Sequence, residues 1–299
     1  MSKLLINAIA SILLITMVFW WVDGAAVLSH LRELSLGWIT VAVVALTAAT
    51  ASMARRWQVV AGHLGLNLRY KLALREYYLG TLINQILPGG VTGDVARAFR
   101  ARDRADLKTA ALSVAMERLL GQVAVFAVLA VGLAWAFVIP GGIDWGPWAW
   151  LVPLGFLLLL AAALQLARRT HLTGRLTAMT LALQRRPELL LHAAFACGCF
   201  LLGLYACARA TGTLVPAHAW FTVMPLILIA MLVPLSVGGL GWREGAAAAL
   251  FPLMGEPSSA GVAAGLAYGA AILIAAMPAV FFLWKVEISR PFATSDPRG

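Results

Sequence analysis

Six windows of this 299-residue chain carry no charged side chain, and each is long enough to cross a membrane as a helix. About 20 apolar residues span the roughly 30 Å hydrocarbon layer. The chain is 62% hydrophobic and 12% charged, whereas about 25% of residues are charged in soluble domains. We therefore expect an all-α polytopic membrane protein with six full spans. The windows are residues 4–22, 36–54, 119–138, 149–167, 189–208 and 258–284. The first is about twice as long as the apolar part of a signal peptide, so we interpret it as a retained helix.

Two more apolar segments, 77–88 and 220–252, are interrupted by glycine and proline. The first break reads NQILPGGVTGDVAR from Asn84 to Arg97, and the second reads VPLSVGGLGWRE from Val233 to Glu244. Interrupted segments at corresponding places in two halves of a chain are typical of a transport site at the centre of an inverted-repeat membrane protein.

The net charge of +10 is unevenly distributed. Lys and Arg gather at 55–108 and 168–186 and follow the last window, which marks these loops and both termini as cytoplasmic. We expect the second span to end at Arg55-Arg56 and the chain to lie in a bacterial cytoplasmic (inner) membrane. Anionic lipid headgroups are the expected partners of the basic loops. No motif indicates nucleic-acid binding.

These charges predict two oppositely oriented halves, residues 1–140 and 141–290, followed by a cytoplasmic tail at 291–299. Each half would contain two spans, a re-entrant helical hairpin and a third span. Segment 77–88 has cytoplasmic flanks and is too short to cross and return, while 220–252 begins and ends outside. Alternatively, the second segment crosses the membrane completely and reverses the last helix. Lys285 and Arg290 favour the first interpretation.

Each break would open a site for negative charge. Glycine permits positive φ and close approach of a ligand, and a helix N-terminus beginning near residues 92–94 or 241 attracts anions. Arg97 or Arg243 would add a donor suited to phosphate. Alternatively, Asp94 only caps its helix and Arg97 only marks the cytoplasmic boundary. The glycines are Gly89, Gly90, Gly93, Gly238, Gly239 and Gly241.

Glu117-Arg118 is the third candidate. Glu117 follows Lys108 by nine residues, about 13 Å along a helix, which approaches the middle of the membrane. Charges at that depth are functional candidates, although Glu117 could instead be a structural partner of Arg97, Arg243 or Asp94. Asn84 either satisfies backbone groups freed by the break or binds a headgroup.

All three cysteines lie within one window, and the histidines do not converge. We expect no disulfide, no metal and no cofactor.

Together, Asn84…Pro88-Gly89-Gly90…Gly93-Asp94…Arg97, Glu117-Arg118 and Gly238-Gly239…Gly241…Arg243-Glu244 resemble the flippase-like transmembrane domain of lysyl-phosphatidylglycerol synthases, the multiple peptide resistance factor family. The resemblance covers nearly the whole chain and implies lipid translocation through a cavity formed by these residues. We expect a stand-alone member without the soluble aminoacyl-transfer domain of the full-length enzymes, and we do not expect it to make the aminoacylated lipid. Stand-alone relatives look like transporters of various lipids, including polyprenyl phosphates.

Our leading hypothesis is a flippase for an anionic or phosphate-headed lipid. Arg97, Arg118 and Arg243 would bind the headgroup, while Asp94, Glu117 and Glu244 would balance their charge. Two alternatives stay open. One is an intramembrane lipid-modifying enzyme that uses Glu117 or Asp94 as acid or base, and the other is a membrane partner subunit of a separate lipid synthase. A homodimer is also left open.

Overall fold

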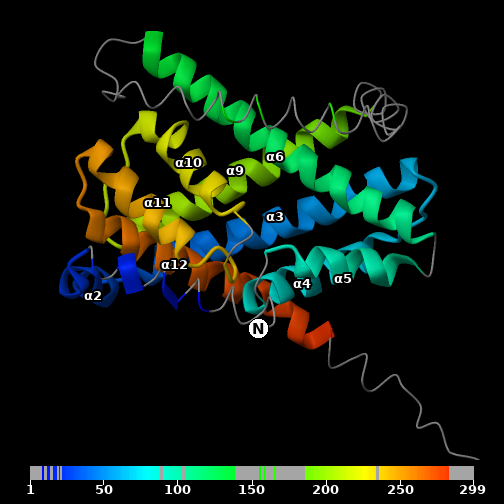
Figure 1. The fold of residues 1–299 in the computed structure, drawn as a ribbon, viewed down its shortest axis with the longest axis horizontal. Helices are drawn as coiled ribbons and strands as arrows, with labels where there is room; N and C mark the ends of the chain where they lie inside the picture. Colours follow the sequence, from blue (N-terminus) through cyan, green and yellow to red (C-terminus); the bar gives the residue numbers. More distant parts are fainter. Residues whose placement is uncertain are drawn as a thin grey trace, which may run out of the picture.

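The computed structural model describes residues 22–87, 90–102, 106–138, 186–233 and 236–282, with scattered positions among residues 9–20 and 155–165. Within these ranges the chain forms helices and no strand (Figure 1). The spans expected at 4–22 and 149–167, the boundary between the two halves and the tail at 291–299 lie wholly or largely outside the described residues.

Four helices are long and apolar enough to cross a membrane: Leu36–His63, Leu107–Trp135, Pro187–Ala210 and Ser258–Phe282. They correspond to four of the six predicted windows, which confirms a multi-pass helical membrane protein. They contain α3 (Leu36–His63), α6 (Leu107–Val138), α9 (Pro187–Ala210) and α12 (Ser258–Ala276). Among the described helices, α3 and α9 pack most extensively, and α12 packs against both.

Helix α3 is longer than the sequence predicted. We expected it to end at Arg55-Arg56, but it continues to His63 and is followed by Gly65 at φ 81°. A glycine in the left-handed conformation commonly ends a helix. Arg56 therefore lies inside the helix with 2% of its surface exposed, and assigning it to a cytoplasmic loop was wrong. The physical reason is that a buried carboxylate compensates its charge, as described below.

Each broken segment forms a helical hairpin. The first consists of α4 (Tyr70–Ile86) and α5 (Thr92–Ala101), and the second of α10 (Val223–Ala230) and α11 (Trp242–Leu250). The predicted half-helix starts near residues 92 and 241 are confirmed. In Figure 1, α4 and α5 lie to the right of centre, and α10 and α11 lie to the left. The order span, hairpin, span thus occurs twice, as α3–α4/α5–α6 and as α9–α10/α11–α12.

The remaining described helices lie at the periphery of this arrangement. Helix α2 (Gly24–Arg32) is capped by Asp23, whose Oδ1 accepts from the amide of Ala25 at 2.9 Å, and it packs against α12. Two 3₁₀ turns, η3 (Ala217–Trp220) and η4 (Phe251–Met254), precede α10 and follow α11.

Glycines shape both breaks. Gly90, Gly238, Gly239 and Gly241 adopt positive φ, as predicted. Gly93 has a different function, because a Cβ there would lie 2.0 Å from the carbonyl oxygen of Gly80. The backbones of α4 and α5 therefore touch where no side chain can fit.

Adding a methyl group at Gly93 tests this contact. We expect Gly93→Ala to lower the free energy of unfolding by about 1–3 kcal/mol, because the Gly80 backbone must move to relieve the overlap. The measurement is thermal or denaturant unfolding of the purified protein in detergent. Gly198→Ala is the matched control, since a Cβ at Gly198 in α9 meets nothing within 4 Å. A Gly93 variant as stable as this control would contradict the close packing.

Candidate functional site

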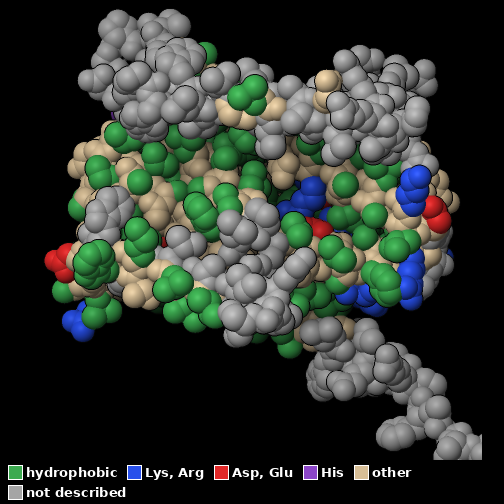
Figure 2. Space-filling model, in the orientation of Figure 1, with side chains coloured by type: hydrophobic (Ala, Val, Ile, Leu, Met, Phe, Trp, Pro, Cys, Tyr) green, Lys and Arg blue, Asp and Glu red, His purple; other side chains and the backbone are tan. Residues whose placement is uncertain are grey.

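A cavity of about 240 Å³ lies between the two hairpins. Its wall is formed by α3, α4, α6, α9, α10 and α12 and by both breaks. The two breaks meet there, because a Cβ on Gly238 would lie 2.5 Å from Oε1 of Gln85. Apolar side chains such as Met53, Phe200 and Ile272 form most of the wall. Among side chains coloured by type, Figure 2 shows basic and acidic groups at a hollow in a mainly hydrophobic face.

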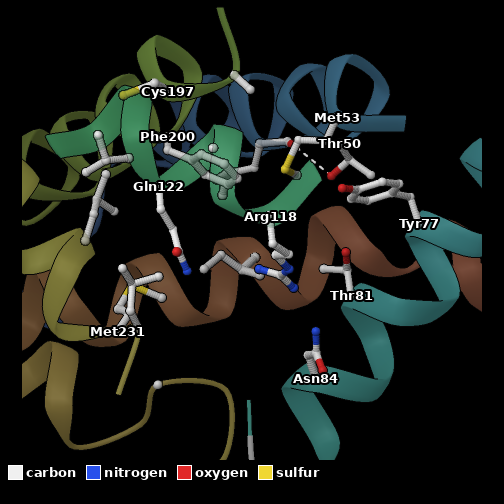
Figure 3. A pocket seen from close by; sticks show the side chains of 18 of the residues that line it. Thr50, Met53, Tyr77, Thr81, Asn84, Arg118, Gln122, Cys197, Phe200 and Met231 are labelled. Carbon is white, nitrogen blue, oxygen red and sulfur yellow. Dashed lines mark hydrogen bonds between the residues drawn. The ribbon is translucent and has the colours of Figure 1, made fainter. Parts of the chain in front are cut away.

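Arg118 is the charged side chain most accessible from this cavity. It projects from α6 with 44% of its side chain exposed, and its Nη2 lies 2.5 Å from Oδ2 of Asp94. Figure 3 shows the polar ends of Arg118, Gln122, Thr81 and Asn84 directed into the cavity. The guanidinium of Arg118 and several uncharged hydrogen-bonding groups therefore face the same space.

Behind Arg118 lies a buried network of ion pairs. Glu117 accepts from Arg56 Nε at 3.0 Å and from Arg56 Nη2 at 2.5 Å, and its other oxygen lies 3.4 Å from Arg97 Nη2. Arg97 Nη2 also lies 3.1 Å from Oδ1 of Asp94. The side chains of Arg56, Arg97 and Glu117 are exposed by 3%, 1% and 1%. This network joins α3 to α5 and α6, which follow it only after α4.

Arg97 is held between aromatic rings. Its Cζ lies 4.5 Å from the ring centroid of Trp57 and 4.1 Å from that of Tyr77. The faces of such rings attract cations, and more strongly when water is excluded. The Trp57 indole N–H donates to Ser113 Oγ at 3.0 Å. Arg97 is consequently fixed in the interior and is not part of the cavity wall.

Asn84 satisfies a backbone group at the first break. Its Oδ1 accepts from the amide of Gly93 at 2.7 Å, near the N-terminus of α5. This is the first of the two roles considered for Asn84. The residue also lines the cavity, and its amide nitrogen points into it (Figure 3).

The second break is stabilised differently. Glu244 accepts from the amide of Gly241 at 2.6 Å and from its neighbour Arg243 at 3.0 and 2.5 Å, which closes the start of α11. The Arg243 guanidinium packs on α12, where a Cβ at Gly269 would lie 2.2 Å from its Nη2. Both side chains are buried, and neither lines the cavity.

The structure therefore divides the predicted site residues into three groups. Asn84, Gly90, Glu117, Arg118, Gly238 and Gly239 line the cavity. Gly93, Asp94 and Arg97 lie behind that wall, whereas Gly241, Arg243 and Glu244 form a separate cluster at α11. Gly89 lies outside the described residues.

Sequence reasoning missed Arg56 and Thr81, which both line the cavity. A signal for Arg56 existed. Leu46, Thr50 and Met53 line the cavity at helical spacing, and Arg56 extends that row by another three residues. The charge pattern groups Arg56 with its neighbour Arg55 and does not indicate the helix face on which each lies.

The three cysteines, Cys197, Cys199 and Cys207, are free and buried in α9. Within the described ranges, no group of three or more His, Cys, Asp or Glu side chains could hold a metal ion.

Comparison with protein-family models shows the family to which the chain belongs. The family model described as "Lysylphosphatidylglycerol synthase TM region" matches residues 8–279, and the chain belongs to this family. The resemblance inferred from the motifs is therefore confirmed. Searches of curated proteins and of solved structures found no match.

Removing the buried carboxylate tests the ion network. We expect Glu117→Gln to lower the free energy of unfolding by about 3–5 kcal/mol, because Arg56 would be left buried without its main counter-charge. The double variant Arg56→Gln/Glu117→Gln should cost less than the sum of the two single changes.

Unfolding of the purified variants in detergent measures both effects. Glu188→Gln is the control, because Glu188 forms exposed pairs with Arg55 and Arg186, and such pairs contribute about 0–1 kcal/mol. Additive single changes at residues 56 and 117 would show that their pairing does not stabilise the fold.

Proposed function

We propose that this member of the lysylphosphatidylglycerol synthase TM region family transports an anionic or phosphate-headed lipid between the leaflets of a membrane. The observation that carries the proposal is the cavity in which the two helix breaks meet and Arg118 is accessible. Its mainly apolar wall suits acyl chains, and Arg118 suits the phosphate. Family membership supports a lipid-related function in the membrane.

We further propose that both hairpins are re-entrant. Helix α4 has 17 residues and would extend about 25 Å. Helices α5, α10 and α11 have 10, 8 and 9 residues and would extend about 15 Å or less. None reaches across roughly 30 Å of hydrocarbon. Irregular backbone at membrane depth is tolerated where it is buried in protein or lines a wet cavity, and Gly90, Gly238 and Gly239 line this one.

In this proposal the headgroup enters the cavity while the acyl chains stay in lipid or along the apolar wall. Arg118 turns from Asp94 to the phosphate, while Gln122, Thr81 and Asn84 offer hydrogen bonds to the rest of the headgroup. The network behind Arg118 holds α3, α5 and α6 together during this exchange. We propose transport rather than catalysis, with both termini cytoplasmic and the protein in a bacterial inner membrane.

Loss of the accessible guanidinium should impair transport. In liposomes that contain a fluorescent phospholipid, we expect Arg118→Gln to slow leaflet exchange at least about tenfold, since one charge-assisted contact is lost. The assay measures how much fluorescence an impermeant quencher removes over time. Arg55→Gln is the control, because it removes an exposed guanidinium that does not line the cavity. Equal rates for the two variants would exclude Arg118 from the transport site.

The same assay addresses the alternatives. A chemically altered lipid product would favour the enzyme, and exchange that requires an added synthase would favour the partner subunit.

Water access tests the re-entrant hairpins. In a cysteine-free background, Thr81→Cys should react with a membrane-impermeant maleimide, because Thr81 lines the cavity. Ala264→Cys should not react, because Ala264 is fully buried in α12. If the cysteine at residue 81 is as unreactive as the one at 264, water does not reach the hairpin.

A further inference from the structure

The charges around the cavity do not cancel. Among the described residues, its wall contains the guanidiniums of Arg56 and Arg118 and the carboxylate of Glu117. The layer behind the wall adds Arg97 and Asp94, which form a pair. Both counts leave one surplus positive charge. The other titratable groups on the wall, Tyr77, Cys197 and Tyr268, are neutral in their usual protonated forms.

The surplus charge can be assigned to Arg118. Arg56, Glu117 and Arg97 are almost completely buried and are held by one another, while 44% of the Arg118 side chain is exposed. If Arg118 leaves Asp94, that carboxylate stays paired with Arg97 at 3.1 Å. Breaking a buried pair is costly when it leaves a buried charge without a partner. This exchange avoids that cost, because Asp94 keeps Arg97 as its partner.

After the exchange, Arg56, Glu117, Arg97 and Asp94 form a neutral group of four. A single positive charge then faces a cavity whose wall is mainly apolar. A ligand with one negative charge neutralises it, whereas a ligand with two leaves a negative charge for which the described wall offers no second unpaired cation.

We infer that the cavity selects lipid headgroups with a single net negative charge, and that Arg118 holds their phosphate. The ligand class is a lipid phosphodiester whose remaining headgroup is uncharged, rather than a phosphomonoester. The uncharged polar groups of Gln122, Thr81, Asn84 and Gln85 suit hydroxyls on such a headgroup. This inference rests on the proposed function and specifies its substrate.

Lipid binding to the purified full-length chain in maltoside micelles tests the inference without any mutation. The probes are short-chain phosphatidylglycerol, which carries one negative charge, and short-chain phosphatidic acid, a phosphomonoester. A phosphomonoester gains its second charge near or above about pH 6. We expect phosphatidylglycerol to bind at least about tenfold more tightly at pH 8. The difference should narrow at pH 5, through a change in phosphatidic acid only. Equal or tighter binding of phosphatidic acid at pH 8 would overturn the inference.

Two variants move the charge balance in opposite directions. Arg118→Gln should weaken phosphatidylglycerol binding at least about tenfold. Asp94→Asn raises the surplus to two positive charges and should reverse the preference at pH 8 in favour of phosphatidic acid. Glu188→Gln removes a carboxylate outside the cavity and should leave the preference unchanged. An Asp94→Asn protein that folds and keeps the original preference would contradict the charge count.

Competition by a deacylated headgroup distinguishes a lipid ligand from a water-soluble one. Deacylated glycerophosphoglycerol should compete only at a concentration about 100-fold or more above that of the lipid, since the wall is mainly apolar. Equal competition would show that the ligand is water-soluble and would overturn the assignment to a lipid.

Transport without a preference between the two lipid charges would overturn this inference and leave the proposed function intact. Charge-selective binding without transport would overturn the proposed function alone.

Discussion

The buried carboxylate of Glu117 is the interaction on which the described arrangement depends. It compensates Arg56 of α3 and Arg97 of α5, and it belongs to α6 itself. A charge in hydrocarbon is costly unless it is paired, so these helices cannot separate without exposing one. The network therefore fixes the first hairpin against two spans. Apolar packing alone specifies such positions weakly, because lipid tails are as apolar as the side chains they would replace.

Each hairpin has free backbone amides at the start of its second helix, and different residues accept hydrogen bonds from them. At the first break Asn84 accepts from the Gly93 amide, and close contact between Gly80 and Gly93 holds α4 on α5. At the second, Glu244 accepts from the Gly241 amide and pairs with Arg243. The second break therefore contains its own counter-charge, while the first shares its charges with α3 and α6. This asymmetry places the accessible guanidinium, that of Arg118, on the side of the first hairpin.

Rigid and adjustable charges are separated by burial. Arg97 is enclosed by Trp57 and Tyr77 and by two carboxylates, so it serves as a fixed counter-charge. Arg118 has one acidic partner in the described part of the chain and keeps contact with the cavity. In the proposed transport cycle, Arg118 exchanges partners without destabilising the fold. Asp94 makes this exchange feasible, because it contacts both Arg97 and Arg118.

The sequence by itself determined the membrane class, the four spans among the described residues, the two breaks and their glycines. Hydrophobic length and the special φ of glycine are local properties that need no tertiary contact. It also identified Glu117-Arg118 and the arginines near the breaks as the unusual charges. Only the tertiary structure decided their partners. Arg56 and Arg55 are indistinguishable as neighbouring letters, but one faces Glu117 and the other faces solvent. Likewise, Arg97 and Arg243 occupy similar places after their breaks, yet neither lines the cavity. Packing between distant helices sets which charge is buried and which is accessible, and no local pattern encodes that choice.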